Sequence, residues 1–167
     1  MDILSSFSLA GRTALVTGGA YGLGFAMARA LAGAGARVAF NCRSQENLDK
    51  ALADYAACGV DARGYLCDVT DEAQVARLVE TIENDLGPID ILVNNAGVIR
   101  RVPMTEMSTE EFRQVVDIDL VGPFICAKAV IPGMADRGHG KIINICSMMS
   151  ELGRETVSAY AAAKGGL

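Results

Sequence analysis

The chain has 167 residues, about half of them hydrophobic, which is enough for one domain with a substantial core. Its 15 basic and 20 acidic residues give a net charge of −5 without runs of one sign, so neither nucleic acid nor an anionic membrane surface is expected as a partner. The five cysteines are odd in number and include no C-x-x-C pair, which argues against a zinc site or a disulfide framework. With no secretory signal or 18-residue apolar run either, we expect a cytoplasmic protein that binds a small molecule.

Short apolar or β-branched runs alternate with longer stretches of helical spacing. Strands are predicted over 13–17, 37–41, 62–67, 89–94 and 141–146, and helices over 24–34, 45–58, 72–86 and 109–135. Asp71 with Gln74 and Ser108 with Glu111 have capping-box spacing at two of the helix starts. Strict alternation predicts parallel strands joined by right-handed crossovers, which is a doubly wound, mostly parallel sheet in a three-layer α/β/α arrangement.

A further helix is predicted to begin near Ser158, yet the sequence ends at Leu167. A sheet covered on both faces needs its closing helix. We therefore expect the chain to be the N-terminal portion of a longer domain, with the closing elements absent.

A glycine-rich segment, Thr17-Gly18-Gly19-Ala20-Tyr21-Gly22-Leu23-Gly24, joins the first predicted strand to the first predicted helix. Glycines at 18, 22 and 24 allow a tight turn, close approach of a pyrophosphate and close packing of the helix on the strand. The segment is not a P-loop, because no Gly-Lys-Ser/Thr follows. A glycine-rich turn without a ligand is the alternative interpretation.

The spacing TGxxxGxG resembles the short-chain dehydrogenase/reductase family. Further matches follow in the family's order: Cys67-Asp68-Val69, then Asn94-Asn95-Ala96-Gly97, then Ser147 thirteen residues before Tyr160-Ala161-Ala162-Ala163-Lys164. The resemblance extends from Thr13 to the last residue. It implies one dinucleotide-binding domain of Rossmann type over 1–167, an NAD(P)-dependent oxidoreductase acting on a CH–OH group, and a homodimer or homotetramer for the full-length protein.

The end of the second predicted strand bears on the choice of cofactor. In dinucleotide-binding folds an acidic residue there selects NAD and a basic one accommodates the 2′-phosphate of NADP. Here Cys42 stands where an NAD-specific relative would carry Asp, and Arg43 follows it. We expect NADP(H); if Arg43 is only a solvated loop cation, NAD(H) is the alternative. The resemblance implies cofactor contacts from Gly18, Tyr21, Gly22, Leu23, Gly24, Arg43, Asp68, Val69, Asn95, Tyr160 and Lys164.

The expected reaction centre consists of Ser147, Tyr160 and Lys164. Tyr160 and Lys164 are four residues apart in a predicted helix and so share a face. A free tyrosine ionises near pH ~10, and a nearby ammonium favours its phenolate. By the resemblance, Tyr160 is the acid/base and Ser147 binds the substrate oxygen.

The family's fourth catalytic residue is normally an Asn, and the matching position here is Asp119. Pro123 has no N–H and so cannot bond the main-chain carbonyl of Asp119, which by the resemblance would hold a water that leads protons to Lys164. A polar residue at a helix kink is the alternative interpretation of Asp119. His139, in a Gly-His-Gly turn, is given no chemical role.

Two stretches, 145–158 and 117–120, resemble the gluconate 5-dehydrogenase (5-ketogluconate reductase) branch of the family. A sugar acid offers a carboxylate and hydroxyls, and Arg100, Arg101, Arg154 and Glu155 supply charge and hydrogen bonds near Ser147. We expect Arg101, Ser147 and Tyr160 to bind 5-keto-D-gluconate or D-gluconate. The alternatives are a 2-deoxygluconate 3-dehydrogenase, another polyol or keto-acid reductase, or a fragment that binds the cofactor and is inactive.

Overall fold

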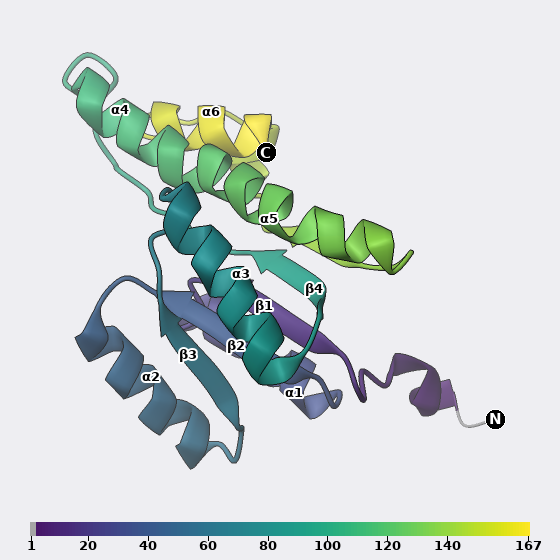
Figure 1. Cartoon of the computed structure of the whole chain (residues 1–167). Coiled ribbons are helices and arrows are strands. Elements are labelled where there is room, and N and C mark those ends of the chain that lie inside the picture. The colour runs from purple at the N-terminus through teal and green to yellow at the C-terminus, as the bar shows by residue number, and fades with distance from the viewer. Residues whose placement is uncertain (1–2) are drawn as a thin grey trace.

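The computed structural model describes residues 3–167 and contains one parallel sheet with helices on both faces (Figure 1). The strands are β1 (Thr13–Thr17), β2 (Arg37–Cys42), β3 (Ala62–Leu66), β4 (Ile89–Asn94) and β5 (Lys141–Asn144). The α-helices are α1 (Gly22–Gly33), α2 (Gln45–Ala57), α3 (Glu72–Leu86), α4 (Thr109–Val116), α5 (Gly122–Asp136) and α6 (Ser158–Gly166). Two 3₁₀ turns, η1 (Ile3–Phe7) and η3 (Met148–Ser150), and one π-helical turn, η2 (Asp117–Val121), complete the order.

The strand order is β3-β2-β1-β4-β5, and every pairing in this sheet is parallel. The order reverses direction between β1 and β4, so the carboxyl ends of these two strands flank a crevice where doubly wound sheets bind their ligands. The predicted fold class, a doubly wound Rossmann-type sheet, is confirmed.

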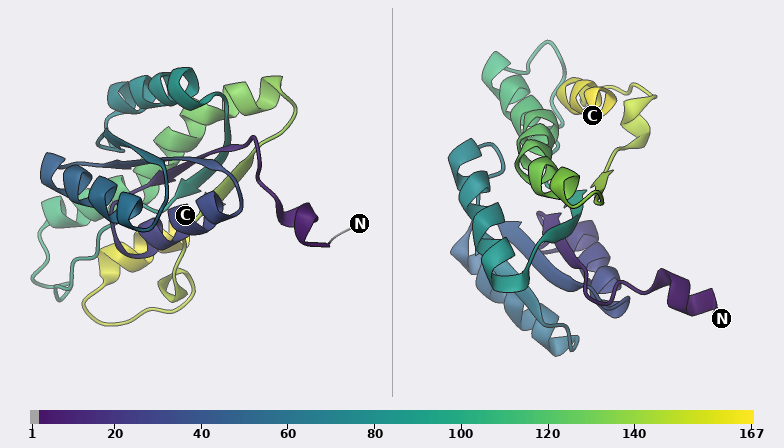
Figure 2. Two further views of the ribbon diagram at one scale, coloured as in Figure 1. Left: turned by 90° about the horizontal axis from the view of Figure 1, so that it is seen from below. Right: turned by 45° about the vertical axis from the view of Figure 1, so that its right-hand side comes forward.

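Two apolar clusters hold the helices against the sheet. Alternate strand residues such as Val16 and Phe40 pack with α1 and α2, whereas Leu15 and Ala39 point to the other face and pack with α3 and α5. In the left view of Figure 2 the two pairs of helices lie on opposite sides of the strands. β1 and β4 are buried throughout, as central strands covered on both faces must be, while β5 is an exposed edge strand.

Both predicted capping interactions are present. Asp71 accepts a hydrogen bond from Gln74 N–H at 2.9 Å, and Ser108 with Glu111 forms a complete capping box. Among the described residues, no helix is long and apolar enough to cross a membrane.

The predicted continuous helix over 109–135 is wrong in one respect, because the π turn η2 separates α4 from α5. In this turn Gly122 N–H bonds to the carbonyl of Asp117, five residues back. Pro123, next along the chain, has no N–H to give to the carbonyl of Asp119 in α register or of Ile118 in π register. A local change of register at a proline follows, and such turns are frequent at functional sites.

A third apolar cluster positions α6. Ala159 and Ala163 pack against Val115 of α4, with Tyr160 and Leu120 at the margin of the cluster. The chain's last helix is therefore held against α4 and η2, as the right view of Figure 2 shows.

Candidate active site

The glycine loop leaves the amino end of α1 open. Tyr21 occupies the N-cap in an extended conformation and makes no side-chain hydrogen bond to the helix. Gly22 has a φ of 60°, and a Cβ on Gly24 would lie 2.4 Å from the carbonyl oxygen of Gly18. The first N–H groups of α1, together with the helix dipole, therefore form a cradle that suits a phosphate.

Two side chains, one half-buried and one buried, brace this loop. The amide of Asn95 donates to the carbonyls of Thr17 at 2.9 Å and Gly18 at 3.1 Å. Tyr55, which is 1% exposed, donates its hydroxyl to the carbonyl of Gly19 at 2.7 Å. Neither contact was predicted from the sequence, since Asn95 was expected only to contact the cofactor and Tyr55 has the spacing of an ordinary core residue of α2.

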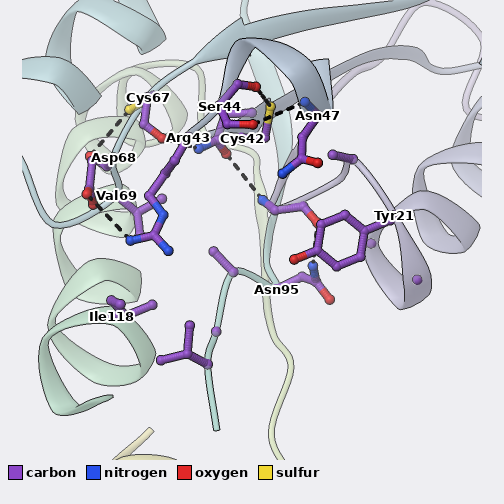
Figure 3. Close-up of a pocket in the computed structure, with 18 of the residues that line it drawn as sticks. Tyr21, Cys42, Arg43, Ser44, Asn47, Cys67, Asp68, Val69, Asn95 and Ile118 are labelled. Atoms are coloured by element: carbon purple, nitrogen blue, oxygen red, sulfur yellow. Dashed lines mark hydrogen bonds and ion pairs between the residues drawn. The ribbon is translucent and has the colours of Figure 1, made fainter. Parts of the chain in front are cut away.

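A cavity of about 420 Å³ opens beside the glycine loop at the carboxyl ends of β1, β2 and β4, a size typical of ligand pockets. Figure 3 shows Arg43 and Asp68 on one side of it and Tyr21 and Asn95 on the other. The nine predicted cofactor residues outside α6 all line it: Gly18, Tyr21, Gly22, Leu23, Gly24, Arg43, Asp68, Val69 and Asn95. The cavity fits a dinucleotide in lining and position. The cavity is also lined by residues that were not predicted, including Asn41, Ser44, Asn47 and Ile118.

The end of β2 presents a cation and no carboxylate to this cavity. Arg43 is largely exposed, and its Nη1 lies 3.9 Å from Oδ2 of Asp68. Burial raises the pKa of the Cys42 thiol, which therefore stays neutral near pH 7. Ser44 caps α2 by accepting Asn47 N–H at 3.1 Å. An anion bound between Arg43 and the first turn of α2 would contact one guanidinium and the polar side chains of Ser44 and Asn47.

Ser147, Tyr160 and Lys164 come from two segments that hydrogen bonds hold together. Ser147 N-caps η3 by accepting Met149 N–H at 3.1 Å, and Ser150 donates to the carbonyl of Lys164 at 2.9 Å. The Lys164 ammonium donates to the carbonyl of Ile145 at 2.9 Å and lies 5.7 Å from the centre of the Tyr160 ring. The helix that carries Tyr160 and Lys164 thus lies against the segment that follows β5 and contains Ser147, and all three residues are outside the lining of the 420 Å³ cavity.

Asp119 enters this group through its side chain. Its Oδ1 accepts Val98 N–H at 2.7 Å, and its Oδ2 lies 3.5 Å from the ammonium of Lys164. Burial raises the pKa of Asp119, while Val98 N–H and Lys164 act in the opposite direction. Sequence reasoning gave Asp119 only a main-chain role, so this pairing is a finding of the structure.

Arg101 is exposed and lies outside the cavity, on the segment that follows β4. The next residue, Val102, donates its N–H to the carbonyl of Thr156 at 2.9 Å, which joins this segment to the loop that contains Arg154 and Glu155. The neighbouring Arg100 is engaged elsewhere, with Gln114 of α4 at 3.3 Å. The two arginines thus differ in that only Arg100 has a side-chain hydrogen bond within the described residues.

Comparison with known proteins adds three relatives. The chain is 54% identical over 162 residues to the 2-dehydro-3-deoxy-D-gluconate 5-dehydrogenase of Formosa agariphila, covering 96% of the chain and 61% of that protein. It is 62% identical to 2-keto-3-deoxy-D-gluconate dehydrogenase from Streptococcus agalactiae, with a TM-score of 0.81 over 96% of the chain and 60% of that structure. It is 43% identical to a gluconate 5-dehydrogenase from Burkholderia cenocepacia, solved with NADP and tartrate, with a TM-score of 0.90 over 98% of the chain and 64% of that structure.

The chain thus spans about three fifths of the length of these relatives. The model of the family described as short chain dehydrogenase matches residues 12–167. Nearly the whole sequence, including the glycine loop and the Ser147, Tyr160 and Lys164 group, lies inside that match. The chain belongs to the short-chain dehydrogenase family.

Proposed function

We propose that the protein carrying this chain is an NADP(H)-dependent oxidoreductase of sugar acids that interconverts 5-keto-D-gluconate and D-gluconate. The observation that carries the proposal is the placement of Tyr160, Lys164 and Ser147 at the carboxyl edge of the same sheet whose glycine loop and cavity suit a dinucleotide. The bound nicotinamide supplies or accepts the hydride. The chain's own residues bind, orient and exchange the proton.

Reduction of a ketone leaves an oxyanion that needs a proton, and Tyr160 is the donor in this proposal. The Lys164 ammonium is held in place by its hydrogen bond to the Ile145 carbonyl. Lys164 lies on the same face of α6 as Tyr160, so its positive charge stabilises the phenolate that remains after the proton has left. The Ser147 oxygen accepts Met149 N–H, which leaves its own hydrogen to donate to the substrate oxygen. Each group thus has a separate task at one reacting C–O bond.

NADP(H) is favoured over NAD(H) by the charge at the end of β2. Arg43 offers a cation to a 2′-phosphate, and the neutral Cys42 offers no carboxylate to a ribose 2′-hydroxyl. The B. cenocepacia relative with NADP agrees with this choice.

A second substrate is favoured by a specific observation. The relatives with 54% and 62% identity are both named for 2-keto-3-deoxy-D-gluconate rather than for gluconate. The two substrates share a carboxylate, which in this proposal binds to Arg101.

The proposal is tested by a panel of sugar acids with the purified protein, following the NADPH absorbance. The panel contains 5-keto-D-gluconate, 2-keto-3-deoxy-D-gluconate and 2-deoxy-D-gluconate, each assayed in the direction its oxidation state allows. We expect the highest kcat/KM for 5-keto-D-gluconate. A higher value for 2-keto-3-deoxy-D-gluconate would transfer the assignment to that substrate, and no turnover with cofactor still bound would favour the inactive cofactor-binding alternative.

The role of Arg101 has a matched control. Arg101→Ala should raise KM and leave kcat nearly unchanged, because an anchor remote from the reacting carbon contributes similarly to the ground state and the transition state. Arg100→Ala removes an adjacent guanidinium that contacts Gln114, and it should alter KM much less. Equal effects of the two variants would remove Arg101 from the substrate site.

The assembly and the compartment are part of the same proposal. We place the protein in the cytoplasm, supported by five free cysteines, and take the chain's strands as one dinucleotide-binding domain. A homo-oligomer is supported by exposed apolar side chains along α4, η2 and α5, namely Phe112, Val121, Phe124 and Ile131. Light scattering should give twice or four times the monomer mass, and a monomer would contradict this part.

A further inference from the structure

The side chain of Asp119 is the most deeply buried ionisable group near the proposed reaction centre. It is 0% exposed, and one of its oxygens, Oδ2, has no hydrogen-bond partner within the described part of the chain. An ionised oxygen without a hydrogen bond is costly to bury unless a positive charge lies close to it.

The only positive charge recorded at this oxygen, within residues 3–167, is the ammonium of Lys164, 3.5 Å away. The Lys164 side chain is itself only 5% exposed. Both charges are therefore shielded from solvent, so water screens the attraction between them only weakly and each favours the ionised form of the other.

The surrounding backbone fixes the carboxylate in place. Oδ1 is held by Val98 N–H at 2.7 Å. A Cβ on Gly97 would lie 2.8 Å from Oδ2, so the glycine at this position provides the space that the carboxylate occupies. The π turn η2 carries Asp119 toward α6, against which η2 packs.

Other ionisable groups contribute little at this point. The 3₁₀ turn η3 brings only the hydroxyl of Ser150, which donates to the Lys164 carbonyl. Helix α4 faces α6 with the apolar Val115. The charged residues of α4 do not face Lys164, because Glu110 and Arg113 are exposed and Glu111 accepts the Ser108 N–H at the start of the helix. Within the part of the chain that the structure describes, the charges that act on Lys164 are thus Asp119 from η2 and, once ionised, Tyr160 from α6 itself.

We infer that Asp119 is a positioning residue whose carboxylate is the fixed counter-ion of Lys164 and sets how much of the ammonium's charge is available to the Tyr160 phenolate. The inference rests on the proposed function, in which Tyr160 exchanges the proton. Because the Asp119 carboxylate is fully buried, we expect it to act electrostatically and not to relay protons itself. A neutral side chain of the same shape would leave Lys164 with its full charge, so the ammonium would stabilise the negative phenolate of Tyr160 more strongly.

The test is the pH profile of kcat for sugar-acid oxidation, in which the phenolate is required. Asp119→Asn should retain turnover at its own optimum and move the acid limb to lower pH by on the order of one unit. Asp117→Asn, an exposed carboxylate two residues away, is the matched control and should leave the limb in place. An unmoved limb in Asp119→Asn would overturn the inference.

A second measurement does not depend on activity. Lys164→Met leaves a buried carboxylate without its partner, so it should lower the urea unfolding midpoint more in the otherwise unmutated protein than in the Asp119→Asn background. Equal losses in the two backgrounds would show no coupling and would also overturn the inference. If the unmutated protein oxidised no sugar acid, the proposed function would fail, whereas this unfolding cycle would still decide whether Asp119 and Lys164 form a pair.

Discussion

At the scale of single residues, the cofactor preference depends on what stands at the end of β2. Cys42 is nearly buried and contributes no charge, while Arg43 reaches to within 3.9 Å of Asp68. This contact is exposed and contributes little to stability, so the guanidinium is free to turn toward an incoming phosphate.

Replacing Cys42 by Asp should reverse the cofactor preference. A carboxylate at this position would repel the 2′-phosphate and accept hydrogen bonds from a ribose 2′-hydroxyl, so the ratio of kcat/KM for NADPH to that for NADH should fall about tenfold or more. Steady-state kinetics with both cofactors measure the ratio. Equal use of NADPH and NADH by the unmutated protein would remove the basis of this assignment.

At the scale of elements, the turn before α6, the helix that carries Tyr160 and Lys164, has an unusual backbone conformation. Thr156 has a φ of 67°, a conformation that β-branched residues rarely adopt. Its carbonyl accepts the Val102 N–H and so joins the turn to the segment that carries Arg101. Backbone strain of this kind is found most often near functional sites, and here it lies two residues before α6.

Relieving the strain should stabilise the fold. Asn tolerates a positive φ better than Thr, so Thr156→Asn should raise the free energy of unfolding by about 1 kcal/mol. Thr105→Asn, in an exposed turn with no positive φ, should change it little. Urea unfolding compares the two, and a less stable Thr156→Asn protein would show that the threonine side chain is needed at this turn.

At the scale of the molecule, the two ends of the sheet have different tasks. The cavity and the reaction centre lie at the carboxyl ends of the strands, whereas the amino ends of β1, β4 and β5 meet at Asp90. Its carboxylate accepts Thr13 N–H at 2.9 Å and lies 3.2 Å from Arg12 Nη1 and 3.0 Å from His139 Nε2. His139, for which no chemical role was expected, thus takes part in a structural cluster far from the site.

This cluster predicts how stability depends on pH. Burial alone would raise the pKa of Asp90, but the bonds from Thr13, His139 and Arg12 outweigh burial and lower it. A carboxyl whose pKa is lower in the folded state stabilises the fold above its unfolded pKa, near ~3.9, and this contribution is lost as the pH falls through the folded value.

Asp90→Asn should therefore cost on the order of 2 kcal/mol at pH 7 and reduce the loss of stability between pH ~4 and lower values. The exposed Asp61→Asn serves as the control. Unfolding curves across the acid range measure both, and an unchanged acid dependence in Asp90→Asn would contradict this account.

Most of the fold could be predicted from sequence because its signals are local. Periodicity and glycine punctuation gave β1, β4 and α3 with the bounds that the structure shows. The glycine loop and the spacing of Tyr160 and Lys164 were equally local. What could not be predicted depends on contacts between distant segments: Asn95 bracing Gly18 across 77 positions, and the Asp119 carboxylate facing Lys164 after the register change before Pro123.

The central claim is that Tyr160 exchanges the proton with the substrate oxygen, on the carbon that gains or loses the hydride, and Tyr160→Phe tests it most directly. The substitution removes one hydroxyl and little volume, so the Kd for NADPH should be retained while kcat for 5-keto-D-gluconate reduction falls about 10²-fold or more. Titration of NADPH and steady-state turnover on the same preparation separate the two effects. Turnover close to that of the unmutated protein, with NADPH bound equally well, would contradict the account.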